Sequence, residues 1–445
     1  MKTKPNVVYV FSDQHRAEAT GYSGNPDVLT PHLDKLSQES VVMKLATSSV
    51  PCCCPYRGTL LTGRYPLTHG VFTNDVHLNH QADSIADAFK KEGYQTGYIG
   101  KWHVNGGGRS GFIARDDRQG FDYWKVLECT HDYNHSYYYS DEPIQLKWDG
   151  YDAEAQTRDA QQYIRDQKEP FFLVLSWGPP HNPYHTAPER FKAMYEPAKL
   201  TIRPNVPPDA GDAARQDLAG YYAHISALDE YVGDLLETLR ETGLEENTIF
   251  VYASDHGDMN GSQGTMRKQC PWEESIRVPF ILKYPAVLGR QPKVIEDPFN
   301  SPDIMPTLLG LCDIPIPQTV EGTDYSPLLR GEQTSIAEGA LIACIHPSGE
   351  YHRGAGGREY RGIRTKQYTY VRDLNGPWLL YDNEIDPYQL HNLCGAAEAA
   401  ELQKRLDEQL CTMLEQRRDE FLPGEIYMER WGYPMDETGT VPYSP

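Results

Sequence analysis

The sequence lacks three features, and each absence excludes a class of protein. No apolar run reaches the length of a membrane span, so we expect no membrane insertion. Basic residues are scarce, because 42 Lys and Arg stand against 63 Asp and Glu and leave a formal net charge of −21. Such a charge repels polyanions and argues against general binding to nucleic acid or membrane surfaces. No Cys-x-x-Cys pair occurs, which makes a zinc site built on such pairs improbable.

The length and the cysteines bound the organisation. A chain of 445 residues is too long for one small core and suits a large domain with a smaller one. Nine cysteines, an odd number, fit a reducing compartment better than a full disulfide framework. Only five residues precede Asn6 and the first expected strand, which leaves no room for a signal peptide. We therefore expect a cytoplasmic protein, or a periplasmic or secreted one if a leader has been removed.

Polar side chains follow four apolar runs of strand length. The runs and their polar followers are 7–11 with Asp13 and Gln14, 95–99 with Lys101 and His103, 170–177 with His181, and 247–253 with Asp255 and His256. Ligands of open α/β sheets gather outside the carboxyl ends of the strands. The pattern therefore predicts an α/β fold with a mostly parallel sheet, flanking helices and one active crevice.

The character of the chain changes after about residue 341. Short β-rich runs at 361–365, 368–371 and 378–381 predict antiparallel strands, and 397–416 predicts a closing helix. We therefore expect a catalytic domain at 1–341 and a small α+β subdomain at 342–445.

The stretch from Cys53 to Arg64 predicts a short helix. Pro55 suits its first turn, and Gly63 ends it after about two turns. Cys53 then lies at a helix N-terminus, where backbone N–H groups favour an anion. Arg57 can direct its guanidinium to the same point. This pattern indicates a buried anion site with a cysteine at its mouth.

These residues carry a family resemblance. Cys-x-Pro-x-Arg at 53–57, followed by Leu-Thr-Gly-Arg at 61–64, resembles the signature of the type I sulfatases of the alkaline-phosphatase superfamily. Gly-Lys-Trp-His at 100–103 and Pro-His-x-Pro at 180–183 resemble further family motifs. Leu-Tyr-Asp at 380–382 with Asp-Pro-x-x-x-x-Asn-Leu at 386–393 resembles the small C-terminal subdomain of sulfatases, so the likeness covers nearly the whole chain. Tyr56 departs from the usual Ser or Ala. The resemblance implies an alkaline-phosphatase-like fold and a Cys53 that a maturation enzyme converts to formylglycine, whose hydrate is the nucleophile.

The resemblance also implies a role for each polar residue. A divalent cation would be held by five residues: Asp13, Gln14, Asp255, His256 and the modified Cys53. Mostly oxygen ligands favour Ca²⁺, and the nitrogen of His256 leaves Mg²⁺ or Mn²⁺ open. Arg57 and Lys101 would fix the nucleophile. His181 and Lys268 would serve the leaving oxygen, with His181 as the general acid. His103 would accept a proton during sulfate release.

The expected reaction is hydrolysis of a sulfate ester, with a sulfated saccharide as the favoured substrate. The aromatic loop 130–139 and the segment Arg353 to Arg364 are candidates for sugar contacts, and ordinary packing explains both equally well. Two alternatives stay open. One is a phosphonate monoester or phosphodiester hydrolase with the same motif, and the other is an inactive metal-binding scaffold.

Overall fold

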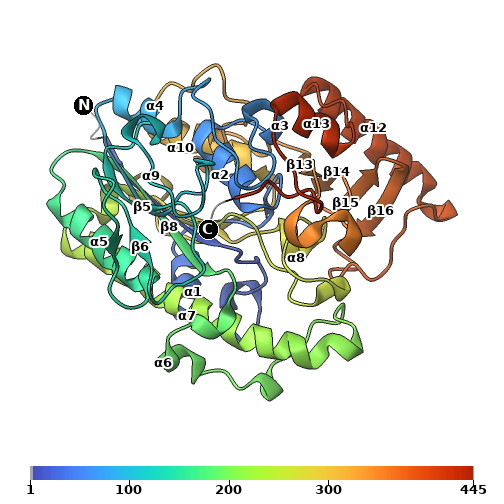
Figure 1. The fold of residues 1–445 in the computed structure, drawn as a ribbon, viewed down its shortest axis with the longest axis horizontal. Coiled ribbons are helices and arrows are strands. Elements are labelled where there is room, and N and C mark those ends of the chain that lie inside the picture. The colour runs from blue at the N-terminus through green and yellow to red at the C-terminus, as the bar shows by residue number, and fades with distance from the viewer. Residues whose placement is uncertain (1–3, 444–445) are drawn as a thin grey trace.

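A computed structural model describes residues 4–443 of the chain, and an eight-stranded sheet lies at its centre (Figure 1). The strand order is β11-β2-β10-β9-β1-β8-β4-β5. The strands are β1 (Asn6–Asp13), β2 (Val41–Met43), β4 (Gln95–Lys101), β5 (Tyr123–Leu127), β8 (Phe171–Pro180), β9 (Thr248–Ser254), β10 (Phe280–Lys283) and β11 (Lys293–Ile295). The five strands from β9 to β5 are parallel, and β10 runs antiparallel to both β9 and β2. The expected mostly parallel sheet is confirmed.

Helices cover both faces of this sheet because its central strands are apolar on both sides. Along β1, Tyr9 and Phe11 pack into one core, whereas Val8 and Val10 pack into the other. The first core includes α2 (Cys53–Thr62), α4 (Ile85–Lys91) and α10 (Ile304–Leu311), and the second includes α1 (Pro31–Ser37), α5 (Asp152–Asp166) and α7 (Gly211–Glu241).

The helix α7 begins earlier than its apolar pattern predicts. The pattern starts at Leu218, but the helix starts at Gly211. The first two turns are mostly polar and only Ala214 is buried among residues 212–217, so they carry no apolar period.

A second, antiparallel sheet follows in the C-terminal part. Its order is β13 (Gly339–Cys344), β14 (Tyr360–Thr365), β15 (Tyr368–Asp373), β16 (Gly376–Asp382), and α12 (Ala400–Gln416) packs on it. The expected small antiparallel sheet is confirmed, and the exact division at residue 341 stays a prediction. The short helix α13 (Gly424–Trp431) was not predicted, because it buries few of its side chains.

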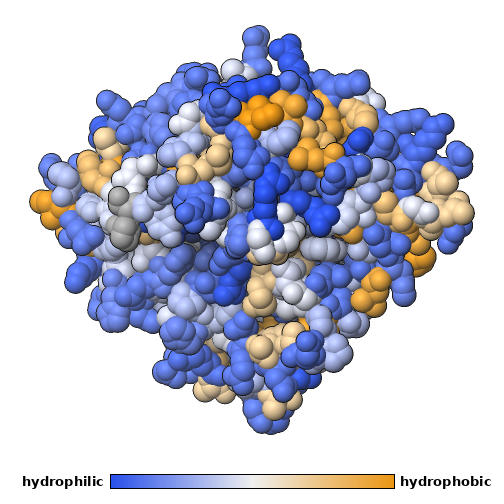
Figure 2. All heavy atoms as spheres, turned by 45° about the vertical axis from the view of Figure 1, so that its right-hand side comes forward, coloured by the Kyte–Doolittle hydropathy of each residue, from blue (hydrophilic) through white to orange (hydrophobic). Residues whose placement is uncertain are grey.

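The remaining elements are short. They are β3 (Ala46–Thr47) with β12 (Phe299–Asn300), β6 (Tyr137–Tyr138) with β7 (Leu146–Lys147), α3 (Pro66–His69), α6 (Glu189–Lys192), α8 (Glu273–Ile276), α9 (Pro285–Leu288) and α11 (Ser326–Leu329). Within residues 4–443, no helix combines the length and apolarity that crossing a bilayer requires. The face in Figure 2 is largely hydrophilic, with hydrophobic residues in separate patches.

Candidate active site

Four adjacent parallel strands deliver the predicted polar residues to one edge of the sheet. Asp13 ends β1 and Lys101 ends β4, while Asp255 follows β9 and His181 follows β8. These strands are neighbours in the order β9-β1-β8-β4, so their carboxyl ends lie side by side. The predicted convergence at one crevice is therefore present.

The helix α2 brings the cysteine to the same edge. Cys53 is its first residue, Cys52 is the extended N-cap, and Gly63 ends the helix with a φ of 63°. Every residue of α2 is buried, and Arg57 lies one turn after Cys53 on the same helix. The sequence placed Cys53 just before the helix, one residue from its observed position.

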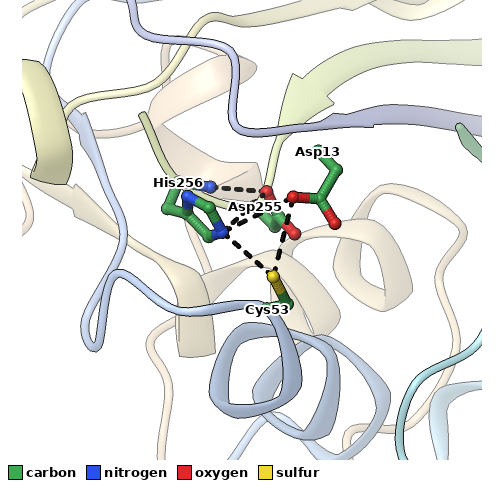
Figure 3. A group of neighbouring side chains, drawn as sticks. All are labelled: Asp13, Cys53, Asp255 and His256. Carbon is green, nitrogen blue, oxygen red and sulfur yellow. Dashed lines mark hydrogen bonds and ion pairs between the residues drawn. The ribbon is translucent and has the colours of Figure 1, made fainter. Parts of the chain in front are cut away.

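Four side chains form a compact group that we call the catalytic cluster: Asp13, Cys53, Asp255 and His256 (Figure 3). Cys53 Sγ lies 3.3 Å from His256 Nε2 and 3.6 Å from Asp13 Oδ1. His256 Nε2 lies 3.6 Å from a carboxylate oxygen of both Asp13 and Asp255. Because one donor atom from each residue lies within 4.8 Å of the others, these residues fit around a single ion.

The charges of this cluster also fit a cation. Burial and the repulsion of Asp13 raise the pKa of the Asp255 carboxyl to about 6. Although burial opposes it, the positive charges of Lys101 and Lys268 help to hold the pKa of Asp13 well below its usual value. Two buried carboxylates so close together repel each other unless a positive charge separates them. A divalent cation with oxygen ligands and one imidazole suits this donor set.

Two buried cations, Arg57 and Lys101, pair with the carboxylates of the cluster. Arg57 Nη2 lies 3.1 Å from Asp13 Oδ2 and 3.4 Å from Asp255 Oδ2, and Lys101 Nζ lies 2.7 Å from Asp13 Oδ2. Arg57 also donates 2.7 Å hydrogen bonds to the Lys101 carbonyl and to Ser176 Oγ. Both cations are therefore fixed before any substrate arrives, as electrostatic catalysis requires.

Lys268 and His181 form a pair on the other side of Cys53. Lys268 Nζ lies 3.5 Å from Cys53 Sγ and donates to His181 Nε2 at 2.7 Å. Burial and the Lys268 charge lower the pKa of His181 well below its usual value, so its imidazole is neutral. His181 Nδ1 donates to the carbonyl of Asn182 at 2.8 Å. In this arrangement Lys268 carries the proton that can be donated. The Nε2 of His181 is unprotonated, so His181 by itself cannot protonate the leaving oxygen.

His103 belongs to a second ionic group. Its Nε2 lies 3.2 Å from Asp75 Oδ1, and Arg109 makes two 2.9 Å hydrogen bonds to the same carboxylate. Although burial opposes it, the Cys129 and Cys54 thiols and Asp75 raise the pKa of His103 well above its usual value. His103 is therefore protonated at neutral pH in the resting protein. It can act as a base only after this proton has left.

Gln14 connects the cluster to Lys268. It has a φ of 73°, its Oε1 accepts from Lys268 Nζ at 2.8 Å, and its Nε2 donates to Asp258 Oδ2 at 2.7 Å. Its role as a metal ligand stays a prediction. Asp258 was not predicted as a site residue; it lies three residues after Asp255 on the same buried segment and accepts the hydrogen bond from the Gln14 amide.

A cavity of about 350 Å³ opens above Cys53. Besides predicted residues, its lining includes Asp75, Arg109, Cys129, His131, Asn182, Glu350, Thr440 and Tyr443. These additional residues lie in loops and near the C-terminus, so the strand-end pattern of the sequence did not identify them.

The two proposed sugar-contact segments differ in their relation to the cavity. In the segment Arg353 to Arg364, Arg361 pairs with Asp419 and Arg364 pairs with Glu273. In the aromatic loop, Tyr137 and Tyr139 donate to backbone carbonyls of residues 109 and 110. His131 of the same loop lines the cavity and stacks on His181, with the ring centroids 4.7 Å apart. Packing accounts for the two arginines and the two tyrosines, and a sugar contact from either segment stays a prediction.

Comparison with known proteins decides the family. The family model described as Sulfatase matches residues 5–314, and the model of the N-sulphoglucosamine sulphohydrolase C-terminal region matches residues 261–416. The chain belongs to the sulfatase family. It is 44% identical to an ulvan-active sulfatase of Formosa agariphila over 99% of this chain and 87% of that protein.

Two further relatives cover the full sulfatase fold. An endo-4-O-sulfatase of Bacteroides thetaiotaomicron is 32% identical over 96% of this chain and 95% of its own length. The crystal structure of a protein assigned as the sulfatase YidJ of Bacteroides fragilis superposes with a TM-score of 0.85 at 31% identity, covering 95% of this chain and 97% of that chain. This sulfatase is accordingly a sulfuric ester hydrolase, and its family uses a divalent metal and a formylglycine.

Proposed function

We propose that this sulfatase hydrolyses a sulfate ester of a carbohydrate at Cys53, after Cys53 has been oxidised to formylglycine. One observation carries the proposal: Cys53 Sγ lies within 3.6 Å of Asp13, His256 and Lys268, on the family's signature helix. The relatives named for ulvan and for endo-4-O-sulfate activity support a saccharide as the substrate. A formylglycine-generating maturation enzyme is then a required partner.

The chain's own residues account for binding and proton movement. When bound, the divalent cation draws charge from the nucleophile and from a sulfate oxygen, and the formylglycine hydrate supplies the attacking hydroxyl. Arg57 and Lys101 fix that position and offset its negative charge. Lys268 protonates the leaving oxygen, either directly or through His181 Nε2, which it already contacts at 2.7 Å.

His103 completes the cycle. Its Nε2–H stays hydrogen-bonded to Asp75. After its Nδ1 has released a proton to solvent, that nitrogen accepts the proton given up at position 53, and this assists release of sulfate.

Calcium is the proposed ion. Three of the five proposed ligand residues, Asp13, Gln14 and Asp255, offer side-chain oxygens, which Ca²⁺ prefers. Mg²⁺ and Mn²⁺ remain alternatives because His256 offers nitrogen. Stripping the protein with a chelator and restoring one ion at a time will rank them, with Ca²⁺ expected to restore most turnover.

Protein made with and without a maturation enzyme tests the function. We expect intact-protein mass to show loss of sulfur at Cys53 only in the matured sample, together with turnover of 4-nitrophenyl sulfate. A parallel assay with an aryl phosphonate monoester separates the rival reaction. Faster turnover of the phosphonate would favour that rival, and no turnover of either ester after metal restoration would favour the scaffold.

A further inference from the structure

The segment 439–443 is held by contacts to residues 346–349 and to the core that contains α2. The Gly439 carbonyl accepts from His346 Nε2 at 2.7 Å, and Thr440 Oγ1 accepts from the backbone N–H of Gly349 at 2.9 Å. Val441 is 5% exposed and belongs to the same core as α2. The segment 439–443 is therefore a fixed part of the fold.

This segment reaches the cavity above Cys53. Thr440 and Tyr443 line the same cavity as Cys53, His181 and Lys268. A side chain so placed meets whatever is attached to the sulfate, because the sulfate itself belongs at Cys53. The end of the chain thus forms part of the wall around the leaving group.

The orientation of Tyr443 is set by a cation. The Arg109 guanidinium carbon lies 3.5 Å from the centroid of the Tyr443 ring, and Asp75 holds Arg109 through two hydrogen bonds. A guanidinium over an aromatic face is an attractive contact. With Arg109 on one face, the opposite face is the one available to a ligand, and Tyr443 remains 44% exposed.

We propose that segment 439–443 builds the leaving-group subsite, in which the free face of Tyr443 stacks on the pyranose ring that bears the sulfate. The proposal rests on the proposed function and specifies its substrate as a sulfated pyranose. A sugar ring has an apolar face of C–H groups for an aromatic side chain and a rim of hydroxyls for polar ones. Glu350, Asn182 and Gln269 line the same cavity and offer acceptors and donors to that rim.

The cavity size agrees with one sugar residue at this position. At about 350 Å³, it lies at the small end of the usual range for ligand pockets, about 300–1,000 Å³.

The test compares Tyr443→Ala and Tyr443→Phe with wild type, all matured at Cys53. The matched control is Met435→Ala, since Met435 is 39% exposed in the same tail but does not line the cavity. The substrates are 4-nitrophenyl sulfate and the preferred member of a panel of glucose, galactose, rhamnose and N-acetylglucosamine monosulfates. The readouts are kcat and KM separately, with the thermal midpoint of each variant.

We expect Tyr443→Ala to raise KM for the sugar sulfate about fivefold to tenfold, while kcat/KM for 4-nitrophenyl sulfate falls less than about threefold. Tyr443→Phe keeps the ring and should restore the wild-type KM, and Met435→Ala should match wild type. An unchanged sugar KM in Tyr443→Ala, or an equal loss on both substrates, would overturn the subsite. Wild type that turns over neither substrate would instead count against the proposed function.

Discussion

The catalytic cluster and the pocket wall of this sulfatase are built differently. The cluster consists of Asp13, Cys53, Asp255 and His256, all 0–2% exposed and all at a strand end or a helix start. The pocket wall, by which we mean Asp75, Arg109, Glu350 and Tyr443, comes from loops and from the chain's end and is more exposed. The sheet fixes the chemistry, whereas segments distant in sequence shape the space for the leaving group.

The difference has an electrostatic side. In the cluster, buried charges act at short range where water does not screen them, so each one matters for every substrate. In the wall, Arg109 and Asp75 neutralise each other and Tyr443 presents an uncharged face. Substitutions in the cluster should therefore lower the turnover of all sulfate esters alike. Substitutions in the wall should lower the turnover of some esters more than that of others.

The largest expected effect is at the nucleophile. Cys53→Ser should lower kcat for every sulfate ester by about 10³-fold or more, because no formylglycine can form there. Intact-protein mass should show a sulfated enzyme that accumulates. Cys54→Ser is the matched control: its thiol faces Asp75 N at 3.3 Å rather than the cluster, and a hydroxyl can accept the same bond. Equal losses in the two variants would refute the assignment of Cys53.

The next effect is at the buried cation beside Asp13. Lys101→Met keeps much of the side-chain volume but removes the charge that lies 2.7 Å from Asp13 Oδ2. We expect kcat/KM to fall by about 10²–10³-fold on sugar and aryl sulfates alike. Lys125→Met, a partly exposed lysine paired with Asp159 at 2.6 Å, serves as the control. A loss confined to sugar sulfates would show that Lys101 acts in recognition of the leaving group, as the pocket wall does, and does not support the cluster.

The convergence of the cluster could be predicted from the sequence because each member follows a local rule. Asp13 ends one apolar strand, Asp255 and His256 directly follow another, and parallel strand ends must meet at one edge. Cys53 was found through Pro55 and Gly63, which mark the two ends of α2.

The wall escaped prediction because no local rule brings its parts together. Tyr443 lies 334 residues after Arg109, and their contact depends on how the C-terminal sheet packs against the main domain. The pairing of Arg361 with Asp419 depends equally on tertiary packing, so the sequence could not show that this arginine was already occupied.

A smaller effect should appear in the pH dependence of kcat when a residue of the wall is changed. Asp75→Asn removes the carboxylate that helps to raise the pKa of His103, so that pKa should fall. If His103 must lose its proton before it can act, the acidic limb of kcat should move to lower pH. At the optimum, kcat should fall about tenfold, because the paired carboxylate also orients the imidazole. An unshifted acidic limb would remove His103 from the proton pathway.

The smallest effect on activity should come from a buried carboxyl outside both regions. Asp152 lies at the start of α5, and burial raises the pKa of its carboxyl to about 8. In the unfolded chain this group ionises near pH 3.9, so between about pH 4 and 8 the folded state binds more protons and stability falls as pH rises. Asp152→Asn cannot ionise, and it should exceed wild type in unfolding free energy by about 1–3 kcal/mol at pH 8 and by much less at pH 5. Chemical denaturation at both pH values measures this difference, and kcat on both substrates should be unchanged. That result would show that burial alone does not make a carboxylate catalytic. The carboxylates of the cluster would then differ from Asp152 through the groups that surround them.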